Sequence, residues 1–95
     1  FYVFTDNPCW VKDNLPEFEY MLVDWNEVSG KRNFRDMQLM SCAKHNIIGN
    51  STYSWWAAWL NANQDKIVVG PKRFFNPINS FFSTCDIMCE DWISL

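Results

Sequence analysis

Short apolar runs alternate with helix-like segments along this chain of 95 residues. Four runs predict strands: residues 1–4, about 19–24, 46–49 and 66–69, of which the first and the last have the continuous apolar pattern of strands buried on both faces. Strands that alternate with helices are typical of a parallel sheet with helices on both sides. The sequence therefore predicts an α/β fold.

A helix is predicted directly after the first strand. Asn7 is a suitable N-cap and Pro8 suits the first helical position, so we expect a short helix through about Asn14. It ends before Pro16, because the residue that precedes a proline resists helical geometry. Residues 25–33 are predicted to form a polar loop.

Two further helices are predicted beyond that loop. Residues 34–44 carry apolar side chains at helical spacing, with an acid in the first turn and a base in the last, as the helix dipole favours. The other helix covers about residues 52–60 and follows the third strand directly. Residues 71–77 are expected to be irregular, the tail from Ile78 to form a short helix, and Trp92 and Ile93 to dock on the core.

The turn before the last of these main helices is the most informative stretch of the chain. A strand, a hydroxyl-rich turn and a helix N-terminus form a common phosphate-binding device, because unpaired N–H groups and the positive end of the dipole point at one spot. Ser51, Thr52 and Ser54 can each donate a hydrogen bond to an anionic oxygen. The alternative, which this stretch alone favours, is that Ser51 or Thr52 merely caps the helix.

Three tryptophans follow that turn. Trp55 and Trp59 share one helical face, and Trp56 lies about 100° round the axis from Trp55. An indole ring there can stack on a base or a sugar, and the alternative, favoured for Trp56 and Trp59, is packing in a core or an interface. Trp55, in the first helical turn, is the ring expected nearest to any ligand.

Acidic residues stand where ligands of parallel sheets bind, beyond the carboxyl ends of the strands. Asp6 and Asp24 end the first two strands, and each is either a strand-end cap or a ligand contact. Asp36 begins the second helix, where its carboxylate can accept hydrogen bonds from guanine ring nitrogens or a ribose hydroxyl, or stabilise the helix dipole. The lone His45 is expected to be structural, and no catalytic constellation or metal cluster emerges.

Composition and charge exclude several classes of function. The net charge is −3, and adjacent basic residues occur only at residues 31–32 and 72–73, too few for a nucleic-acid-binding face. No apolar run is long enough to span a membrane. Aromatic residues make up 18% of the chain, so some are expected to be covered by a partner surface. Because the chain opens as a strand without a lead-in, we expect it to be part of a longer protein.

The four cysteines do not form a recognisable disulfide framework. Cys9 and Cys42 fall in predicted helices, and Cys85 and Cys89 form a Cys-x3-Cys pair. We therefore expect reduced, mostly buried thiols, and from these a cytoplasmic protein.

Several segments, taken in order, resemble one family. They are residues 4–7, 36–41 (Asp-Met-Gln-Leu-Met-Ser), 44–48, 50–60 (Asn-Ser-Thr-Tyr-Ser-Trp-Trp-Ala-Ala-Trp-Leu), 66–72 and 90–93. Over essentially the whole chain they resemble the carboxyl-terminal part of bacterial α-1,2-fucosyltransferases, glycosyltransferase family 11. The ordered pair of Asp-Met-Gln-Leu-Met-Ser and Asn-Ser-x-x-Ser-Trp-Trp makes this resemblance specific.

The resemblance implies a GT-B enzyme whose Rossmann-like carboxyl-terminal half binds GDP-β-L-fucose. Such enzymes transfer fucose with inversion to the 2-hydroxyl of a terminal galactose, without a metal ion or another cofactor. Residues 1–95 would then be a single partial domain that lacks the acceptor domain. By position, the substrate-binding residues would be Asp36 near the guanosine, Ser51, Thr52, Ser54 and the N–H of Trp55 near the diphosphate, and Asp6 near the cleft; the catalytic residue stays unassigned.

The chain departs from the family pattern in two places. The basic His-x-Arg-x-Asp-type motif, which supplies a cation to the leaving diphosphate, is missing and is expected upstream of Phe1. Asn7 stands where family members usually carry a second acid. The 95-residue chain alone is therefore expected to be inactive, with Lys72 and Arg73 as its nearest substitutes for the missing cation.

The expected partners are GDP-fucose and a galactose-terminated glycan, in a cytoplasmic protein without nucleic acid. Peripheral association with the inner membrane, and self-association through exposed aromatic side chains, are left open. Two alternatives also remain at this stage. One is a non-catalytic nucleotide-binding or assembly domain, and the other is a transferase for another GDP-sugar or linkage.

Overall fold

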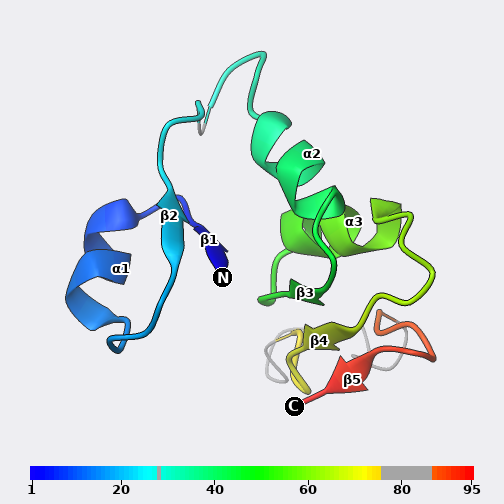
Figure 1. The fold of residues 1–95 in the computed structure, drawn as a ribbon. Coiled ribbons are helices and arrows are strands. Elements are labelled where there is room, and N and C mark those ends of the chain that lie inside the picture. The colour runs from blue at the N-terminus through cyan, green and yellow to red at the C-terminus, as the bar shows by residue number, and fades with distance from the viewer. Residues whose placement is uncertain (28, 76–86) are drawn as a thin grey trace. The chain divides into compact units, whose positions relative to one another are not determined.

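The fold is known from a computed structural model that describes residues 1–27, 29–75 and 87–95. It contains short parallel strands and three helices (Figure 1), so the predicted α/β class with parallel pairing is confirmed. The chain forms two compact units, Phe1–Asp36 and Met37–Leu95. Each unit is built around a strand–helix–strand segment.

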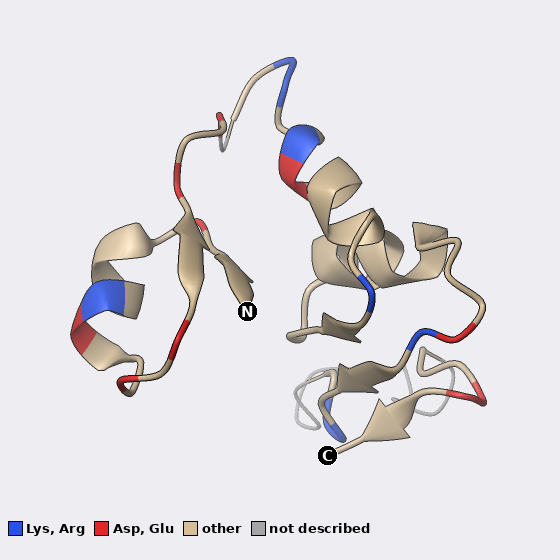
Figure 2. Ribbon diagram, in the orientation of Figure 1, with Lys and Arg blue, Asp and Glu red and all other residues tan. Residues whose placement is uncertain are grey.

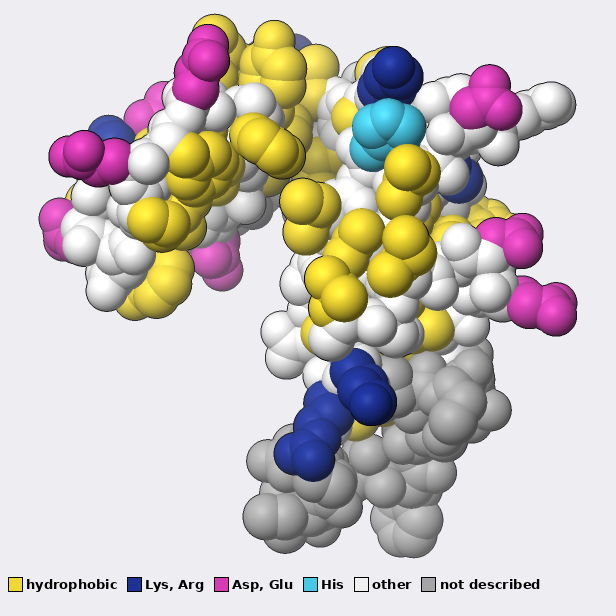
Figure 3. Space-filling view, turned by 60° about the horizontal axis from the view of Figure 1, so that its bottom comes forward, with side chains coloured by type: hydrophobic (Ala, Val, Ile, Leu, Met, Phe, Trp, Pro, Cys, Tyr) yellow, Lys and Arg dark blue, Asp and Glu magenta, His cyan; other side chains and the backbone are white. Residues whose placement is uncertain are grey.

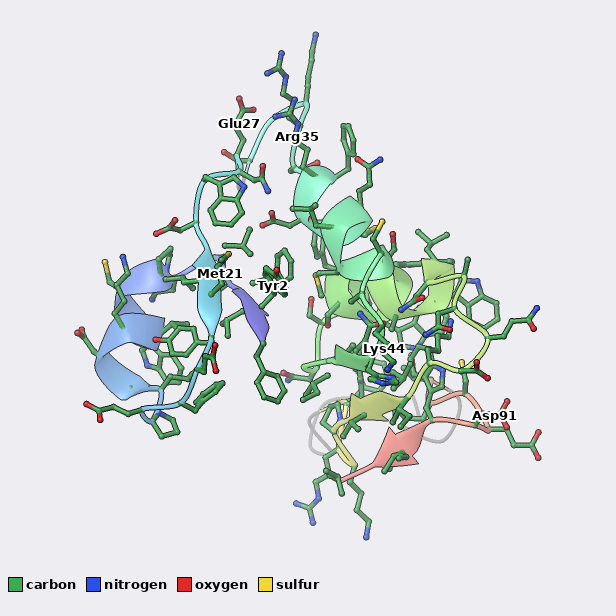
Figure 4. The ribbon with its side chains drawn as sticks, in the orientation of Figure 1. Tyr2, Met21, Glu27, Arg35, Lys44 and Asp91 are labelled. Carbon is green, nitrogen blue, oxygen red and sulfur yellow. The ribbon has the colours of Figure 1, made fainter. Side chains whose placement is uncertain are left out.

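The first unit consists of β1 (Tyr2–Phe4), α1 (Pro8–Asn14) and β2 (Met21–Val23). The two strands pair in parallel, and Tyr2 lies opposite Met21, as Figure 4 also shows. The side chain of Asn7 accepts the N–H of Trp10 at 3.1 Å, and Pro8 is the first helical residue. The predicted cap and bounds of α1 are thus confirmed.

The predicted burial of the first strand on both faces is wrong. Tyr2 is 69% exposed and Met21, opposite it on β2, is 52% exposed. A two-stranded sheet with one short helix covers only one side of each strand, and among the described residues of this unit the buried hydrophobic side chains are Val11 and Val23.

The second unit holds a three-stranded parallel sheet in the order β3-β4-β5. Its elements are α2 (Arg35–Ser41, whose first two residues are assigned to the first unit), β3 (Asn46–Ile47), α3 (Thr52–Leu60), β4 (Val68–Gly70) and β5 (Ile93–Ser94). The bounds of α3 agree with the sequence prediction. β5 is an addition, since the sequence predicted only that residues 92–93 dock on the core.

A small apolar core joins α3 to the sheet. Ile48, Ala58 and Val68 are buried together, and Trp55 and Trp92 pack against them. The predicted docking is therefore confirmed for Trp92 but not for Ile93, which is 48% exposed. A Cβ at Gly70 in β4 would lie 2.8 Å from Cε of Met88, so the flexible end of that side chain would have to shift.

A buried amide pair fixes the ends of the two helices. Nδ2 of Asn61 donates to Oδ1 of Asn46 and to the carbonyl of Ala43, both at 2.7 Å. Nδ2 of Asn46 in turn donates to the carbonyl of Met40 at 2.9 Å. These bonds join the end of α2, the start of β3 and the residue after α3, and they satisfy the polar groups that burial would otherwise leave unpaired.

Several boundaries differ from the prediction, among them those of β2, which covers Met21–Val23 instead of about residues 19–24. α2 ends at Ser41 instead of continuing to residue 44, because the N–H groups of Cys42 and Ala43 turn to the carbonyls three residues back. β3 ends at Ile47, two residues early. β4 begins two residues late, since Lys66 is directed at the end of α3. The helix predicted in the tail from residue 78 falls largely outside the described residues.

The cysteines also need a correction. Cys9 and Cys42 are exposed, because α1 buries only Val11 and Cys42 follows the end of α2. Cys89 is half-buried, and Cys85 lies outside the described residues. In the described ranges of the chain, no helix has the length and apolar character needed to cross a membrane.

Candidate functional site

Ser51 caps α3. Its backbone is extended, and its Oγ accepts the N–H of Tyr53 at 3.2 Å. The helix-cap interpretation of the turn is thus confirmed. The bond uses the hydroxyl as an acceptor, so the O–H of Ser51 remains able to donate to an anion.

The other polar groups of this turn divide into two sets. The N–H of Trp55 donates to the carbonyl of Ser51 at 3.0 Å, and the hydroxyl of Ser54 donates to the same oxygen, also at 3.0 Å. The N–H groups of Thr52 and Ser54 and the hydroxyl of Thr52 have no hydrogen-bond partner in the described part of the chain. An anion at the start of α3 would therefore meet Thr52 and Ser51 before Trp55.

Trp55 faces the core of the second unit. Its Nε1 donates to the carbonyl of Ile87 at 2.8 Å, and its ring stacks on Trp59 with centroids 5.4 Å apart and planes 10° apart. It also contacts Trp56 edge to face and lies against Trp92. The ring of Trp55 is thus part of an aromatic cluster that stabilises the start of α3.

Trp56 and Trp59 are less covered than core packing requires. Their exposed fractions are 49% and 54%, so the part of the prediction that placed them in a core is wrong. The reason is that α3 turns Ala57 and Ala58, and not these rings, toward the sheet. Packing in an interface stays a prediction.

The charge around the turn favours an anion. Figure 2 shows no charged residue on α3, and its first turn contains no acid that would offset the positive end of the dipole. Lys72 and Arg73 follow β4 and are exposed, and their side chains form no hydrogen bond or ion pair in the described residues. Figure 3 shows basic side chains grouped at one end of the second unit, beside a patch of hydrophobic ones.

Asp36 is held by an asparagine that the sequence analysis missed. Nδ2 of Asn26 donates to Oδ1 of Asp36 at 2.6 Å in part-buried surroundings. The signal that could have found it is its place two residues beyond Asp24, at the end of the second predicted strand. With one oxygen fixed, the second oxygen of Asp36 is oriented and can accept a further hydrogen bond.

The remaining predicted residues have simpler surroundings. Asp6 is exposed in the bend after β1, and Asp24 forms an exposed ion pair with Lys12 at 3.5 Å. Nδ1 of His45 accepts the N–H of Ile67 at 3.0 Å, which agrees with the structural role expected for it. That bond also requires the proton of a neutral imidazole to lie on Nε2.

The six predicted substrate-binding residues lie in both units. Asp6 and Asp36 belong to the first unit, and Ser51, Thr52, Ser54 and Trp55 to the second. Their convergence on one ligand stays a prediction. Within the described ranges, no group of three or more His, Cys, Asp or Glu side chains could hold a metal ion.

Sequence comparison identifies the class of protein to which this fold and turn belong. Residues 1–95 match the profile of a glycosyltransferase family, so the chain is part of the glycosyltransferase class. The family is glycosyl transferase family 11, and the chain belongs to it.

Two relatives from Escherichia coli match the chain along nearly its whole length. An O-antigen biosynthesis glycosyltransferase, WbnK, is 43% identical over 94 residues, which are 98% of this chain and 29% of the relative. An alpha-1,2-colitosyltransferase is 36% identical over 97 residues, which are 100% of this chain and 32% of the relative. The chain thus spans about a third of the length of these relatives. No solved structure matches it significantly.

Proposed function

We propose that residues 1–95 are the carboxyl-terminal, donor-binding part of an inverting α-1,2-glycosyltransferase with a GT-B, Rossmann-like fold. The donor is GDP-β-L-fucose, and the acceptor is the 2-hydroxyl of a terminal galactose. The observation that carries the proposal is the strand, turn and helix of residues 46–60, in a chain of glycosyl transferase family 11. The transferase works in the cytoplasm, without a metal ion or cofactor.

The start of α3 supplies the phosphate side of the donor site. The N–H groups of Thr52 and Ser54 and the hydroxyls of Ser51 and Thr52 are the groups that can bind diphosphate oxygens there. Asp36, oriented by Asn26, accepts from the guanosine. Asp6 and Trp55 are the remaining residues that we assign to substrate binding.

The leaving group determines what these residues contribute to catalysis. The sugar departs from a diphosphate on which negative charge develops, and donors aimed at that charge lower the barrier. The start of α3 supplies oriented N–H groups and a partial positive charge, whereas full neutralisation needs a cationic side chain. We assign that cation to a segment outside these 95 residues, so the 95-residue chain alone is inactive.

The identity of the sugar is the finer part of the proposal. One relative is named as a colitosyltransferase with an alpha-1,2 linkage, which supports that linkage here and makes GDP-colitose the alternative donor. Colitose is fucose without its 3-hydroxyl. A site that hydrogen-bonds this hydroxyl rejects the sugar that lacks it, because the polar groups of the site are then left unpaired.

The test uses the full-length transferase that contains this segment. It is incubated with GDP-fucose, GDP-colitose or GDP-mannose and a β-galactoside, and the linkage of the product is determined by NMR. We expect α-1,2 transfer of fucose, and none by the 95-residue chain compared with a boiled control. Transfer of colitose alone would replace fucose as the sugar, and no transfer from any of the three would refute the function.

A second candidate is a non-catalytic assembly domain, which the half-exposed rings of Trp56 and Trp59 favour. The two functions differ in the effect of Trp56→Ala with Trp59→Ala. An assembly domain loses its association in analytical ultracentrifugation, whereas a donor site retains its transfer rate.

A further inference from the structure

The first turns of α2 and α3 are joined by one hydrogen bond that the sequence did not indicate. The phenolic oxygen of Tyr53 accepts the N–H of Met37 at 2.9 Å in part-buried surroundings. Met37 is the third residue of α2, and N–H groups in a first turn have no acceptor within their own helix. Tyr53, the second residue of α3, therefore caps α2 from outside.

Both partners of this bond are chain neighbours of proposed donor-site residues. Met37 directly follows Asp36, assigned to the nucleoside, and Tyr53 lies between Thr52 and Ser54, assigned to the diphosphate. The bond consequently fixes the start of α2 against the turn that presents the phosphate-binding groups. Tyr53 itself is not assigned to the substrate.

Hydrogen bonds hold both ends of α2. None of the residues of α2 is fully buried. At its far end the carbonyls of Met40 and Ala43 accept from Asn46 and Asn61, and at its near end Met37 donates to Tyr53. A helix held at both ends in this way shifts when either end is released.

We propose that Tyr53 is a positioning residue of the donor site, because its hydroxyl, by holding Met37, determines where α2 presents Asp36 to the nucleoside of the GDP-sugar. This inference rests on the proposed function. Binding groups must be held within about 0.5 Å of their productive position, so a small shift of α2 weakens recognition of the nucleoside. The chemical step, which takes place at the diphosphate and the sugar, is not affected.

The test is Tyr53→Phe in the full-length transferase. This change removes the acceptor and keeps the ring. We expect the donor KM to rise about tenfold, the order of one lost hydrogen bond, with kcat and the acceptor KM unchanged. The matched control is Tyr2→Phe, since the hydroxyl of Tyr2 makes no hydrogen bond in the described residues and its loss should leave every constant unchanged.

A double-mutant cycle separates positioning from a general loss of structure. If Tyr53 acts through Asp36, the variant with both Tyr53→Phe and Asp36→Asn has the donor KM of Asp36→Asn alone, because the side chain to be positioned has already lost its function. Additive effects would mean that Tyr53 supports only the fold, and an unchanged donor KM in Tyr53→Phe would mean that the bond has no role. Either result overturns the inference.

The two possible failures are distinguishable. A wild-type enzyme that transfers no sugar from a GDP donor refutes the proposed function, and the inference with it. Active wild-type enzyme with no response to Tyr53→Phe refutes the inference alone. Amide hydrogen exchange at Met37 verifies that the substitution acts where intended, since exchange should accelerate in Tyr53→Phe and not in Tyr2→Phe.

Discussion

The two strand–turn–helix segments of this chain use the same cap in different surroundings. β1 leads through Asn7 into α1, and β3 leads through Ser51 into α3; each cap accepts a backbone N–H from the first turn. At α1, however, Pro8 removes one N–H and the neighbouring Asp6 adds a negative charge. The start of α3 has neither feature. An anion is therefore favoured at α3 and opposed at α1.

Burial separates the two helices as well. α1 buries only Val11. In contrast, α3 buries Ala57 and Ala58 and is further stabilised by the aromatic cluster around Trp55. The cap residue indicates where a helix begins, whereas the charges and the packing around it decide whether that start can also serve as a rigid binding site.

The largest effect should come from the tryptophans of the two helices. Trp55→Ala removes a ring that packs on the core and bonds the carbonyl of Ile87, so we expect a loss of about 3 kcal/mol in the free energy of unfolding. Trp10→Ala on α1 removes a ring that is 56% exposed and should cost less than about 1 kcal/mol. Urea denaturation measures both, and equal losses would contradict the contrast in burial.

Removing either helix cap should cost the same stability, but only one of the two changes should affect donor binding. Ser51→Ala and Asn7→Ala each remove one cap and should each cost about 1 kcal/mol. Only Ser51→Ala should also raise the donor KM of the full-length transferase, because the proposed diphosphate site lies at the start of α3 and not at α1. A rise of the donor KM of the same size in Asn7→Ala would mean that both helix starts contribute to donor binding, which would contradict the contrast between α1 and α3.

Two lysines allow a smaller test. Nζ of Lys66 donates to the carbonyls of Ala58 and Asn61 at 2.8 and 2.7 Å, and so provides hydrogen-bond partners for carbonyl groups at the end of α3. Lys66→Met should therefore cost about 1 kcal/mol. Lys12→Met breaks an exposed ion pair between α1 and Asp24 and should cost about 0.3 kcal/mol. Thermal unfolding measures both losses of stability, and a greater loss in Lys12→Met than in Lys66→Met would contradict this prediction.

The smallest expected effect concerns thiol reactivity. Burial raises the pKa of the Cys89 thiol, which the charge of Lys66 lowers and that of Asp91 raises. Cys89 should therefore react with iodoacetamide more slowly than the exposed Cys9 at neutral pH, and the difference should narrow as the pH rises. Mass spectrometry of the labelled peptides measures both rates, and faster labelling of Cys89 would contradict this order.

The raised pKa of the Cys89 thiol also predicts how the stability of the fold changes with pH. The folded protein holds the Cys89 proton more tightly than the unfolded chain, so its contribution is fully present below the pKa of the unfolded thiol. It is lost as the pH rises through the pKa of the folded state. Lys66→Met, which removes the charge that lowers this pKa, should extend the contribution to higher pH.

Local signals predicted the helix starts well. Asn7 with Pro8, and Ser51 before a run of helix-compatible residues, gave the starts of α1 and α3 because cap preferences depend on adjacent residues alone. The end of α2 was not predictable in this way. The carbonyls near this end are bonded by Asn46 and Asn61, which follow α2 in the chain and are not part of any periodic pattern.

The candidate site was predictable to the same extent. The cap by Ser51 is encoded locally and was anticipated as one of two interpretations. The bond from Asn26 to Asp36 and the contact of Trp55 with Ile87 join residues 10 and 32 positions apart. No sequence pattern of period two or 3.6 indicates such pairs, because they result from how the elements pack.

The buried pair of Asn46 and Asn61 has a consequence for how the second unit assembles. Its contacts, like those of Lys66 with the end of α3, lie within residues 40–66 and close short loops. Short loops cost little entropy to close and are expected to form early. β5 pairs with β4 over about the same separation as β3 does, but it follows β4 in the chain. During synthesis, we therefore expect β3, α3 and β4 to come together first and the last strand to add to them.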